Sequence, residues 1–507
     1  MNKQLLKAIL PMTAMLFAIG CMVGPKYHTP PATAQAPPAS YKESPTQFPT
    51  TEGWKPAQPQ DGMLRGKWWE IYNDSELSSL EEQLNVNNQN IKQAFENFMA
   101  ARTLIAQAHS QLYPTIGTAP AYSRSRGSAN TGGTVLGTVS STGAHTVSLN
   151  TLPLSISWEP DLWGRVRNMI RNAQYNAQLS EADLENERLT EQALLATTFF
   201  EIRGQDALIR LFQDTVEQDQ KALDLAKARY ETGVDTEISV VEAQNTLQNA
   251  QAGLTNLGIA RAQFEHSIAM LIGTNASSFS VPNRTLSATP PPVPLGIPSE
   301  LLERRPDIAA AERNMAAANA QIGIAVAAFY PSLDLSVTGG LESSTFKHLF
   351  DWPSRFWSVG GTVNETLYDA GLRRATVNQF IETYNADVAG YRQTVLTAFE
   401  QVEDALASLR ILSQQIKQQE DAVHSAQRFV ELEMGRYQTG IDPYINVVTA
   451  QNTLLSDQQS LTSLYTQHMT ASVQLIEALG GGWDRSQLPS TGDVSKKLTA
   501  SETTIQR

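Results

Sequence analysis

Hydrophobic residues recur at helical spacing through two very long parts of the chain. Residues 161–281 and 354–442 contain no proline, so long uninterrupted helices are allowed there. Apolar residues in the first part are three, four and seven positions apart, the spacing of a coiled-coil seam: Leu208, Phe212, Val216, Leu223 and Ala226. The pattern predicts two pairs of helices, over 165–230 and 237–272 and over 373–437 and 445–479. The longer helix of each pair would extend about 100 Å.

A second pattern, strict alternation of apolar and polar residues, occupies shorter segments. It is clear in LPLSISW, from Leu152, and in PSLDLSVTGGL, from Pro331, and weaker over 115–124 and 357–367. A period of two residues is typical of strands with one apolar face. We therefore expect two strands in each half of the chain, with a glycine-rich exposed loop over 127–143.

The chain is internally duplicated. The segment RYETGVDTEISVVEAQNTL, from Arg229, is repeated as RYQTGIDPYINVVTAQNTL, from Arg436, 207 residues later and without a gap. Tyr113-Pro114 and Tyr330-Pro331 match at an offset of 217 residues. Each half reads helix, strand, strand, helix, helix, and the repeated segment falls at the turn between the last two helices. There we predict glycines in a left-handed helix-ending position and aspartates as N-caps of the next helix: Gly233, Gly440, Asp235 and Asp442.

Composition and charge narrow the class of protein. The 507 residues are 41% hydrophobic and 18% charged, and after the N-terminus no apolar run is long enough for a membrane-spanning helix. With 51 acidic and 38 basic residues the net charge is −13, which disfavours nucleic acid as a partner.

The number of predicted strands limits how they could lie in a membrane. Four strands cannot close a barrel, and open sheet edges are costly in lipid because their backbone groups stay unpaired. If the strands lie in a membrane, three chains with twelve strands form the smallest assembly that encloses a channel.

The N-terminus reads as a secretory signal peptide over 1–20, with Lys3 and Lys7 ahead of an apolar run. It ends at Cys21, the only cysteine in the chain. A lone cysteine is commonly a small buried hydrophobe, but one that directly follows an apolar leader resembles the acylated (palmitate-bearing) first residue of a bacterial lipoprotein. The next residues, 21–66, are rich in Pro, Thr, Ser and Gln and predict an extended strap.

Catalytic and metal-binding patterns are not found in the sequence. The seven histidines are scattered, and H-E-x-x-H, G-x-S-x-G and G-x-x-x-x-G-K-[ST] do not occur. We therefore predict that the protein is not an enzyme and has no cofactor, catalytic residue or metal site.

Several segments together resemble the outer membrane factor family of TolC-like channels and OprM/NodT-like lipoproteins, which serve tripartite efflux pumps. These segments are CMVGPKYHTP, GKWWEIYNDSELSSL, WEPDLWGRVR, the two Arg-Tyr-x-Thr-Gly turns and PSELLERRPDIAAAERNM. The resemblance implies a mainly α fold with a small β part. A homotrimer would form a 12-strand outer-membrane β-barrel on a long 12-helix periplasmic α-barrel, with a mixed belt from 74–101, 282–298 and the C-terminal region.

The resemblance also implies roles for residues. The second turn would narrow the pore through Asp442, Tyr444 and Ile445, and Cys21 would carry the lipid. The turns would form the tips on which a periplasmic adaptor protein docks, through Arg229, Gly233, Asp235, Arg436 and Gly440. An inner-membrane RND-type transporter would supply the cargo, which the sequence does not identify. The protein would lie in the outer membrane, lipid-anchored, with a long periplasmic extension.

By this interpretation the chain comprises a signal peptide (1–20), an acylated strap (21–66), a first repeat (67–281), a proline-rich linker (282–298), a second repeat (299–482) and a polar tail without fixed structure (483–507). Two alternatives stay open. A non-conducting coiled-coil scaffold or surface lipoprotein would share the long helices, although it would not need the matched strand pairs. The exit duct of a protein-secretion system would share the whole architecture.

Overall fold

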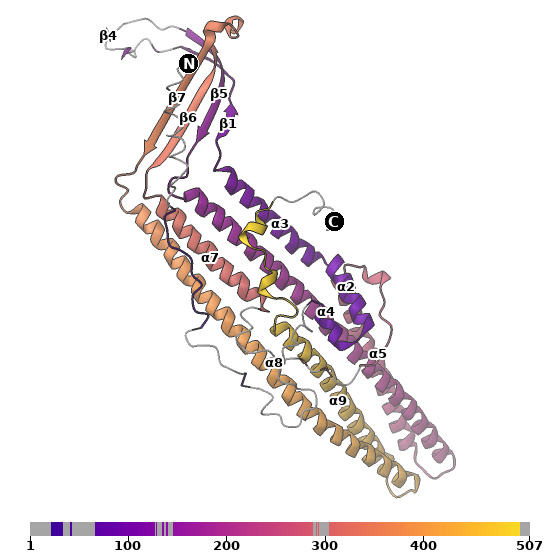
Figure 1. Cartoon of the computed structure of the whole chain (residues 1–507). Coiled ribbons are helices and arrows are strands. Elements are labelled where there is room, and N and C mark those ends of the chain that lie inside the picture. Colours follow the sequence, from indigo (N-terminus) through magenta and orange to yellow (C-terminus); the bar gives the residue numbers. More distant parts are fainter. Residues whose placement is uncertain are drawn as a thin grey trace.

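The computed structural model describes residues 22–33, 41–42, 66–126, 128, 134–135, 138–139, 146–286, 290–291, 293 and 304–496. The molecule is elongated, with a sheet at one end and two helical turns at the other (Figure 1). The predicted signal peptide and Cys21 lie outside the described residues, as do most of the strap, much of the proline-rich linker and residues 497–507.

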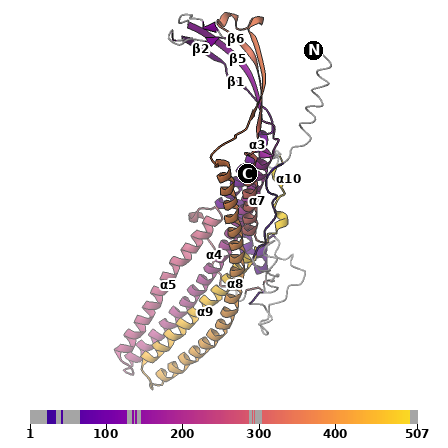
Figure 2. The ribbon, with the colours of Figure 1, turned by 90° about the vertical axis from the view of Figure 1, so that its left-hand side faces the viewer.

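Two long helical hairpins make up most of the length. The first consists of α4 (Arg165–Glu231) and α5 (Glu237–Leu271), and the second of α8 (Leu372–Gln438) and α9 (Tyr444–Ala478). Both longer helices have 67 residues and both shorter ones have 35, which confirms the predicted helices and their duplication. At about 1.5 Å per residue, α4 and α8 each extend about 100 Å. The two turns lie side by side at the end far from the sheet (Figures 1 and 2).

The sheet is antiparallel and joins strands from both halves. Its order is β1 (Thr115–Thr118), β5 (Thr146–Trp158), β6 (Ser332–Ser343) and β7 (Arg355–Asn364), and β2 (Ala121–Arg126) also pairs with β5. Two strands per half were predicted, and the first of them is broken at 119–120 because Pro120 has no N–H for the ladder. The predicted glycine-rich loop contains a two-residue strand pair, β3 (Thr134–Val135) with β4 (Thr138–Val139), which the sequence pattern missed.

Shorter helices flank the long ones near the middle of the molecule. They are α2 (Ser75–Asn87), α3 (Gln89–Ser110) and α7 (Pro306–Ala327). One helix ends and another begins between α2 and α3. The Asn88 side chain accepts hydrogen bonds from the N–H groups of Asn90 and Ile91 and so caps the new helix. Both α3 and α7 have 22 residues, and they are 217 residues apart, the offset of the Tyr-Pro pairs that follow them.

The largest apolar core also lies in this middle region. It joins η3 (Trp68–Tyr72) and α2 to the long helices. Val281, the last residue of the first repeat, and Val293, in the linker, are also buried in it. Trp68 is fully buried, and its indole Nε1 donates to Gln192 Oε1 at 3.1 Å. Through Val293 the linker thus contributes to this core.

The C-terminal region differs from the expected tail without fixed structure. Over 483–496 it forms η8 (Arg485–Gln487) and α10 (Thr491–Val494). Trp483 and Val494 are buried, and Arg102 Nε donates to the Val494 carbonyl at 3.3 Å. The burial of apolar side chains and the hydrogen bonds from the helices together hold this segment in place.

The first described segment, 22–33, runs extended along the helices, as expected of a strap. Val23 N–H donates to the Trp163 carbonyl at 3.1 Å, beside the start of α4. Gly24 packs so closely on Gly323 that a Cβ there would lie 2.6 Å from the Gly323 Cα. Further on, the Tyr27 hydroxyl donates to Glu312 Oε1 at 2.7 Å. Residues 22–33 of the strap are therefore packed against the body.

Within the described residues, none of the helices combines the length and the apolar character that crossing a membrane requires. The same residues contain no group of three or more His, Cys, Asp or Glu side chains arranged to hold a metal ion.

Candidate functional site at the paired helical turns

The two turns have the same backbone structure. Gly233 (φ 71°) and Gly440 (φ 75°) adopt the predicted left-handed conformation, which favours glycine. In the first turn Val234 N–H donates to the Arg229 carbonyl at 2.9 Å, and in the second Ile441 N–H donates to the Arg436 carbonyl at 2.9 Å. These bonds satisfy carbonyls that the helix end would leave unpaired.

The predicted N-caps are wrong by one residue. The N-cap positions of α5 and α9 are Thr236 and Pro443, and neither side chain caps its helix. Asp235 stands one position earlier, where its Oδ1 accepts the Thr236 N–H at 2.7 Å and the Ser239 hydroxyl at 2.8 Å. Its carboxylate thus still binds to the first turn of α5, while its other oxygen is free to bind the second hairpin.

A small polar cluster joins the two turns. The Tyr437 hydroxyl, from the end of α8, donates to Asp235 Oδ2 at 2.6 Å. Arg229, from the end of α4, donates through Nη1 to the Gln438 carbonyl at 2.9 Å, and its guanidinium lies 4.8 Å from the centre of the Tyr437 ring. The equivalent pair of the second turn, Arg436 and Asp442, instead forms an ion pair within its own hairpin.

Beneath this cluster lies a compact apolar core. The rings of Tyr437 and Tyr444 meet edge to face at 5.1 Å, a favoured aromatic geometry. Small and aliphatic side chains from both hairpins surround them: Ala222, Leu223, Ala226, Ala243, Leu247 and Val447. Of the three predicted pore residues, Tyr444 is buried in this core with 2% of its surface exposed, whereas Ile445 is 46% exposed. The exposed fraction of Asp442 lies between these two values, and its carboxylate forms an ion pair with Arg436.

The packing at the tip shifts the pKa values of several side chains. Burial acts to raise the pKa of Asp235, but the hydrogen bonds from Tyr437, Ser239 and Thr236 and the charge of Arg229 outweigh it and hold the pKa below its ordinary value. Asp219, on α4, is 3% exposed, and its Oδ2 has no hydrogen-bond partner among the described residues. Burial raises the pKa of Asp219 to about 6. Burial, with the nearby charges of Asp219 and Glu242, raises the pKa of Tyr444 to about 12.

Sequence reasoning missed Asp219, since an aspartate within a long helix reads as a solvated side chain. It also did not pair Tyr437 with Asp235, 202 residues apart. The duplication offered one signal for the pair, because it placed an Arg, a Tyr and an Asp at the same positions in both turns.

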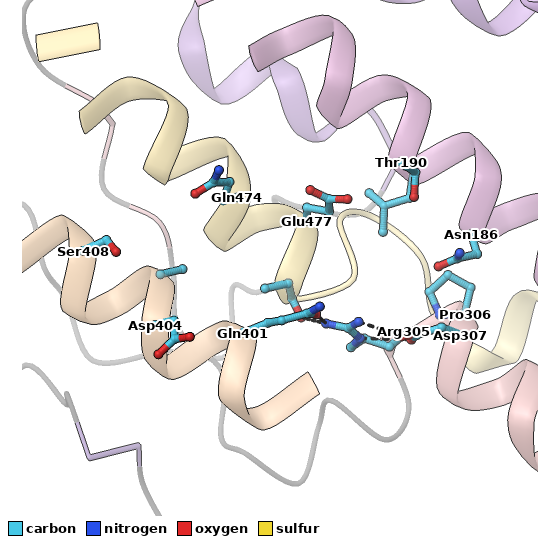
Figure 3. A pocket seen from close by; sticks show the side chains of 13 residues that line it. Asn186, Thr190, Arg305, Pro306, Asp307, Gln401, Asp404, Ser408, Gln474 and Glu477 are labelled. Atoms are coloured by element: carbon cyan, nitrogen blue, oxygen red, sulfur yellow. Dashed lines mark hydrogen bonds and ion pairs between the residues drawn. The ribbon is translucent and has the colours of Figure 1, made fainter. Parts of the chain in front are cut away.

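The Arg-Arg-Pro-Asp motif lies in the middle of the molecule, away from the turns. Arg305 Nη1 donates to the Ala478 carbonyl at 2.9 Å and to Gln401 Oε1 at 2.8 Å, and Nη2 pairs with Asp307 at 2.6 Å. Figure 3 shows these groups converging at one end of a polar cavity of about 480 Å³ between α4, α7, α8 and α9. The motif therefore joins the start of α7 to both helices of the second hairpin.

The chain is similar to known proteins over nearly its whole length. The profile of the family described as "Outer membrane efflux protein" matches residues 80–274 and 297–481. The toluene efflux pump outer membrane protein TtgC of Pseudomonas putida is 30% identical over 485 residues, covering 95% of this chain and 96% of that protein. The antibiotic efflux pump outer membrane protein ArpC of Pseudomonas putida matches at the same identity and coverage.

Among solved structures, the outer-membrane channel OprN superposes with a TM-score of 0.81 and 25% identity, covering 91% of this chain and all of that one. The resemblance predicted from the sequence motifs is thereby confirmed. The chain belongs to the outer membrane efflux protein family, whose members are the outer membrane factors.

Proposed function

We propose that this protein is the outer-membrane exit duct of a tripartite efflux pump and works as a passive homotrimeric channel with a gate at the helical turns. The observation that carries the proposal is the pairing, in one chain, of an open sheet with two hairpins about 100 Å long. The resemblance to TtgC, ArpC and OprN supports the same function.

The sheet supports a trimer. Its outer strands, β7 on one side and β1 with β2 on the other, have one unpaired edge each within the described sheet. Large apolar side chains of β7, including Trp357, Val359 and Val363, are exposed. Unpaired edges and apolar faces suit a closed barrel in lipid and not an isolated sheet in water. Three chains would bring each edge against that of a neighbour and leave room for a channel.

The gate would lie at the second turn. Ile445 is exposed there, Asp442 carries a charge held by Arg436, and Tyr444 would act from beneath by supporting the turn. The hydrogen bond from Tyr437 to Asp235 ties this turn to the first one. An opening movement of the second hairpin away from the first would break that bond.

The same tips would dock a periplasmic adaptor through Arg229, Gly233, Asp235, Arg436 and Gly440, and an inner-membrane RND-type transporter would deliver the cargo. The names of the relatives support small organic cargo such as toluene and antibiotics. Acylated Cys21 would anchor the strap in the outer membrane, with the long helices in the periplasm. We also propose that the protein has no cofactor, catalyses no reaction and does not bind nucleic acid.

Single-channel conductance in planar bilayers tests the proposal. The Asp442→Ala, Ile445→Ala double variant is compared with the wild type and with Ile238→Ala, which changes the equivalent of Ile445 in the first turn. We expect a small conductance in the wild type and in Ile238→Ala, and a large one in the double variant. An intact trimer without conductance in any variant would instead favour the scaffold lipoprotein.

A further inference from the structure

The strand register divides the side chains of the sheet between two faces. Residues directly opposite each other in an antiparallel pair share a face, and successive residues along a strand alternate between faces. One face of the sheet is largely apolar, with these side chains: Ile116, Leu152, Leu154, Ile156, Leu335, Val337, Leu341, Trp357, Val359 and Val363. The other face carries many hydroxyl groups, from Ser155, Ser157, Ser336, Thr338, Ser358 and Thr362.

Charged side chains are sorted by the same division. All three arginines of the described strands, Arg124, Arg126 and Arg355, lie on the apolar face. Both acidic residues of these strands, Asp334 and Glu342, lie on the polar face. Positive charge is therefore confined to the face that carries the apolar side chains.

The arginines occupy the end of the sheet that lies farthest from the helices (Figures 1 and 2). Strand β2 ends at Arg126 and β7 begins at Arg355, both at this end. Beyond Leu152 the apolar face becomes polar, because β5 continues there with Asn150, Ser148 and Thr146. An arginine on a lipid-facing surface is costly at the centre of a bilayer and nearly free of cost at its interface. The arginines thus begin where the apolar band ends, at the level of lipid head groups.

The two arginines of β2 are available to a ligand. Both are exposed, and within the described residues their side chains form no hydrogen bond and no ion pair. Arg124 and Arg126 are two residues apart on one face, about 7 Å along the strand. Both guanidinium groups can therefore reach one head group that carries several negative charges.

A second cationic position lies on the opposite edge of the sheet, three strands and about 14 Å away. There the Arg355 guanidinium carbon lies 3.4 Å from the centre of the Trp352 ring, which is 75% exposed. Phe346 and Phe350, in the same connection between β6 and β7, are also exposed. Aromatic side chains are favoured where a membrane meets water. Both edges of the sheet thus place arginine at the interface, one of them with aromatic neighbours.

We infer that Arg124 and Arg126 form a binding site for the phosphate groups of lipid A, the membrane-embedded glycolipid part of lipopolysaccharide. Guanidinium groups bind phosphate through paired, charge-assisted hydrogen bonds. The apolar band next to the site would contact the acyl chains, and Arg355 with Trp352 would contact the same layer of head groups. This inference rests on the proposed position of the sheet in the outer membrane and adds a ligand to it.

Lipid binding by the purified full-length protein in detergent tests the inference, with native mass spectrometry to measure bound lipid at several concentrations. The probes are phosphorylated lipid A, the same lipid A after removal of its phosphates, and phosphatidylglycerol, which has a single phosphate. The wild type is compared with Arg124→Gln, Arg126→Gln. The control is Arg210→Gln, Arg428→Gln, which removes two exposed arginines from α4 and α8.

We expect the variant at Arg124 and Arg126 to bind phosphorylated lipid A about 10-fold more weakly than the wild type, because charge-assisted hydrogen bonds are lost. The control variant should bind like the wild type. Removal of the phosphates should weaken binding to the wild type by a similar factor and abolish its difference from the variant. Phosphatidylglycerol should bind more weakly than phosphorylated lipid A.

Equal affinity of the wild type for the two forms of lipid A would overturn the inference, and this comparison needs no variant to fold. An equal loss in the control variant, or phosphatidylglycerol bound as tightly as lipid A, would also overturn it. Channel conductance separates this inference from the proposed duct. Conductance without a preference for phosphorylated lipid A would leave the duct standing alone, whereas the preference without conductance would leave only the lipid site.

Discussion

Replacing Tyr437 by Phe removes the hydroxyl that ties the second turn to the first and keeps the ring. The lost bond is short, at 2.6 Å, and its acceptor is charged. Hydrogen bonds to charged groups contribute about 1.5–3 kcal/mol, and the Asp235 side chain is 15% exposed. We therefore expect a loss of about 1–2 kcal/mol per chain, because partial hydration recovers some of the interaction. Asp235 would not be left unpaired, since Thr236 and Ser239 still donate to it.

A loss of that size shifts an equilibrium about 5- to 30-fold. If the bond holds the gate shut, the open fraction of single channels in planar bilayers should rise by that factor for each turn that is released. Asp235→Asn should raise it at least as much, because it weakens the same bond and also removes the charge beside Arg229. The double variant should exceed Asp235→Asn by little, because the bond between the two side chains is then already lost.

The control is Tyr444→Phe, which removes a hydroxyl from the adjacent ring and leaves the bond to Asp235 in place. Its open fraction should match that of the wild type. The reasoning would be refuted if Tyr437→Phe gated like the wild type, or if the two single variants at Tyr437 and Asp235 gave fully additive effects.

Three further changes have defined outcomes. Gly440→Val places a β-branched residue at φ 75° and should cost about 1–2 kcal/mol and impair drug export in cells, whereas Gly435→Ala, within α8, should leave export intact; full export by the valine variant would count against the strained turn. Asp219 is more basic in the folded chain, with a pKa of about 6 against an ordinary 3.8, so the unfolded chain binds fewer protons between these values and stability falls as pH rises through them. Asp219→Asn should therefore raise the thermal midpoint at about pH 7 but not at about pH 4, by up to about 3 kcal/mol in unfolding free energy, and an equal change at both values would contradict the assignment. Cys21→Ser should abolish labelling by radioactive fatty acid while the trimer still forms, and unchanged labelling would disprove the anchor.

The helices were predictable from the sequence because they depend on local signals. The absence of proline and the duplication placed the ends of α4 and α8 within one residue of those observed. Strand β5 followed from its alternation, although its start at Thr146 lies six residues before the clear pattern. Helices and strands depend on residues that are close together in the sequence, so the spacing of apolar residues predicts them directly.

The contacts at the tip were not predictable, because they depend on how distant helices pack. The pore role of Tyr444 was implied by the family resemblance and not by a sequence pattern, and the burial of its ring in a core from both hairpins became visible only in the structure. Asp219 reads as a surface residue until the second hairpin covers it. The break between α2 and α3 at Asn88 was not predicted, because several asparagines lie nearby in the sequence and only the backbone shows which one caps the helix.

The packing of residues 22–33 against the body constrains the order in which parts of the chain can fold. Tyr27 finds its partner Glu312 285 residues later, and Asn319 donates to the Pro25 carbonyl at 3.1 Å. Contacts between such distant residues form late, since the long intervening loop must close first. The N-terminal segment therefore stays undocked until the second half has been synthesised and α7 has formed. The enzyme that would acylate Cys21, as proposed above, would then meet an undocked segment, and the later packing of residues 22–33 would reduce their access to proteases.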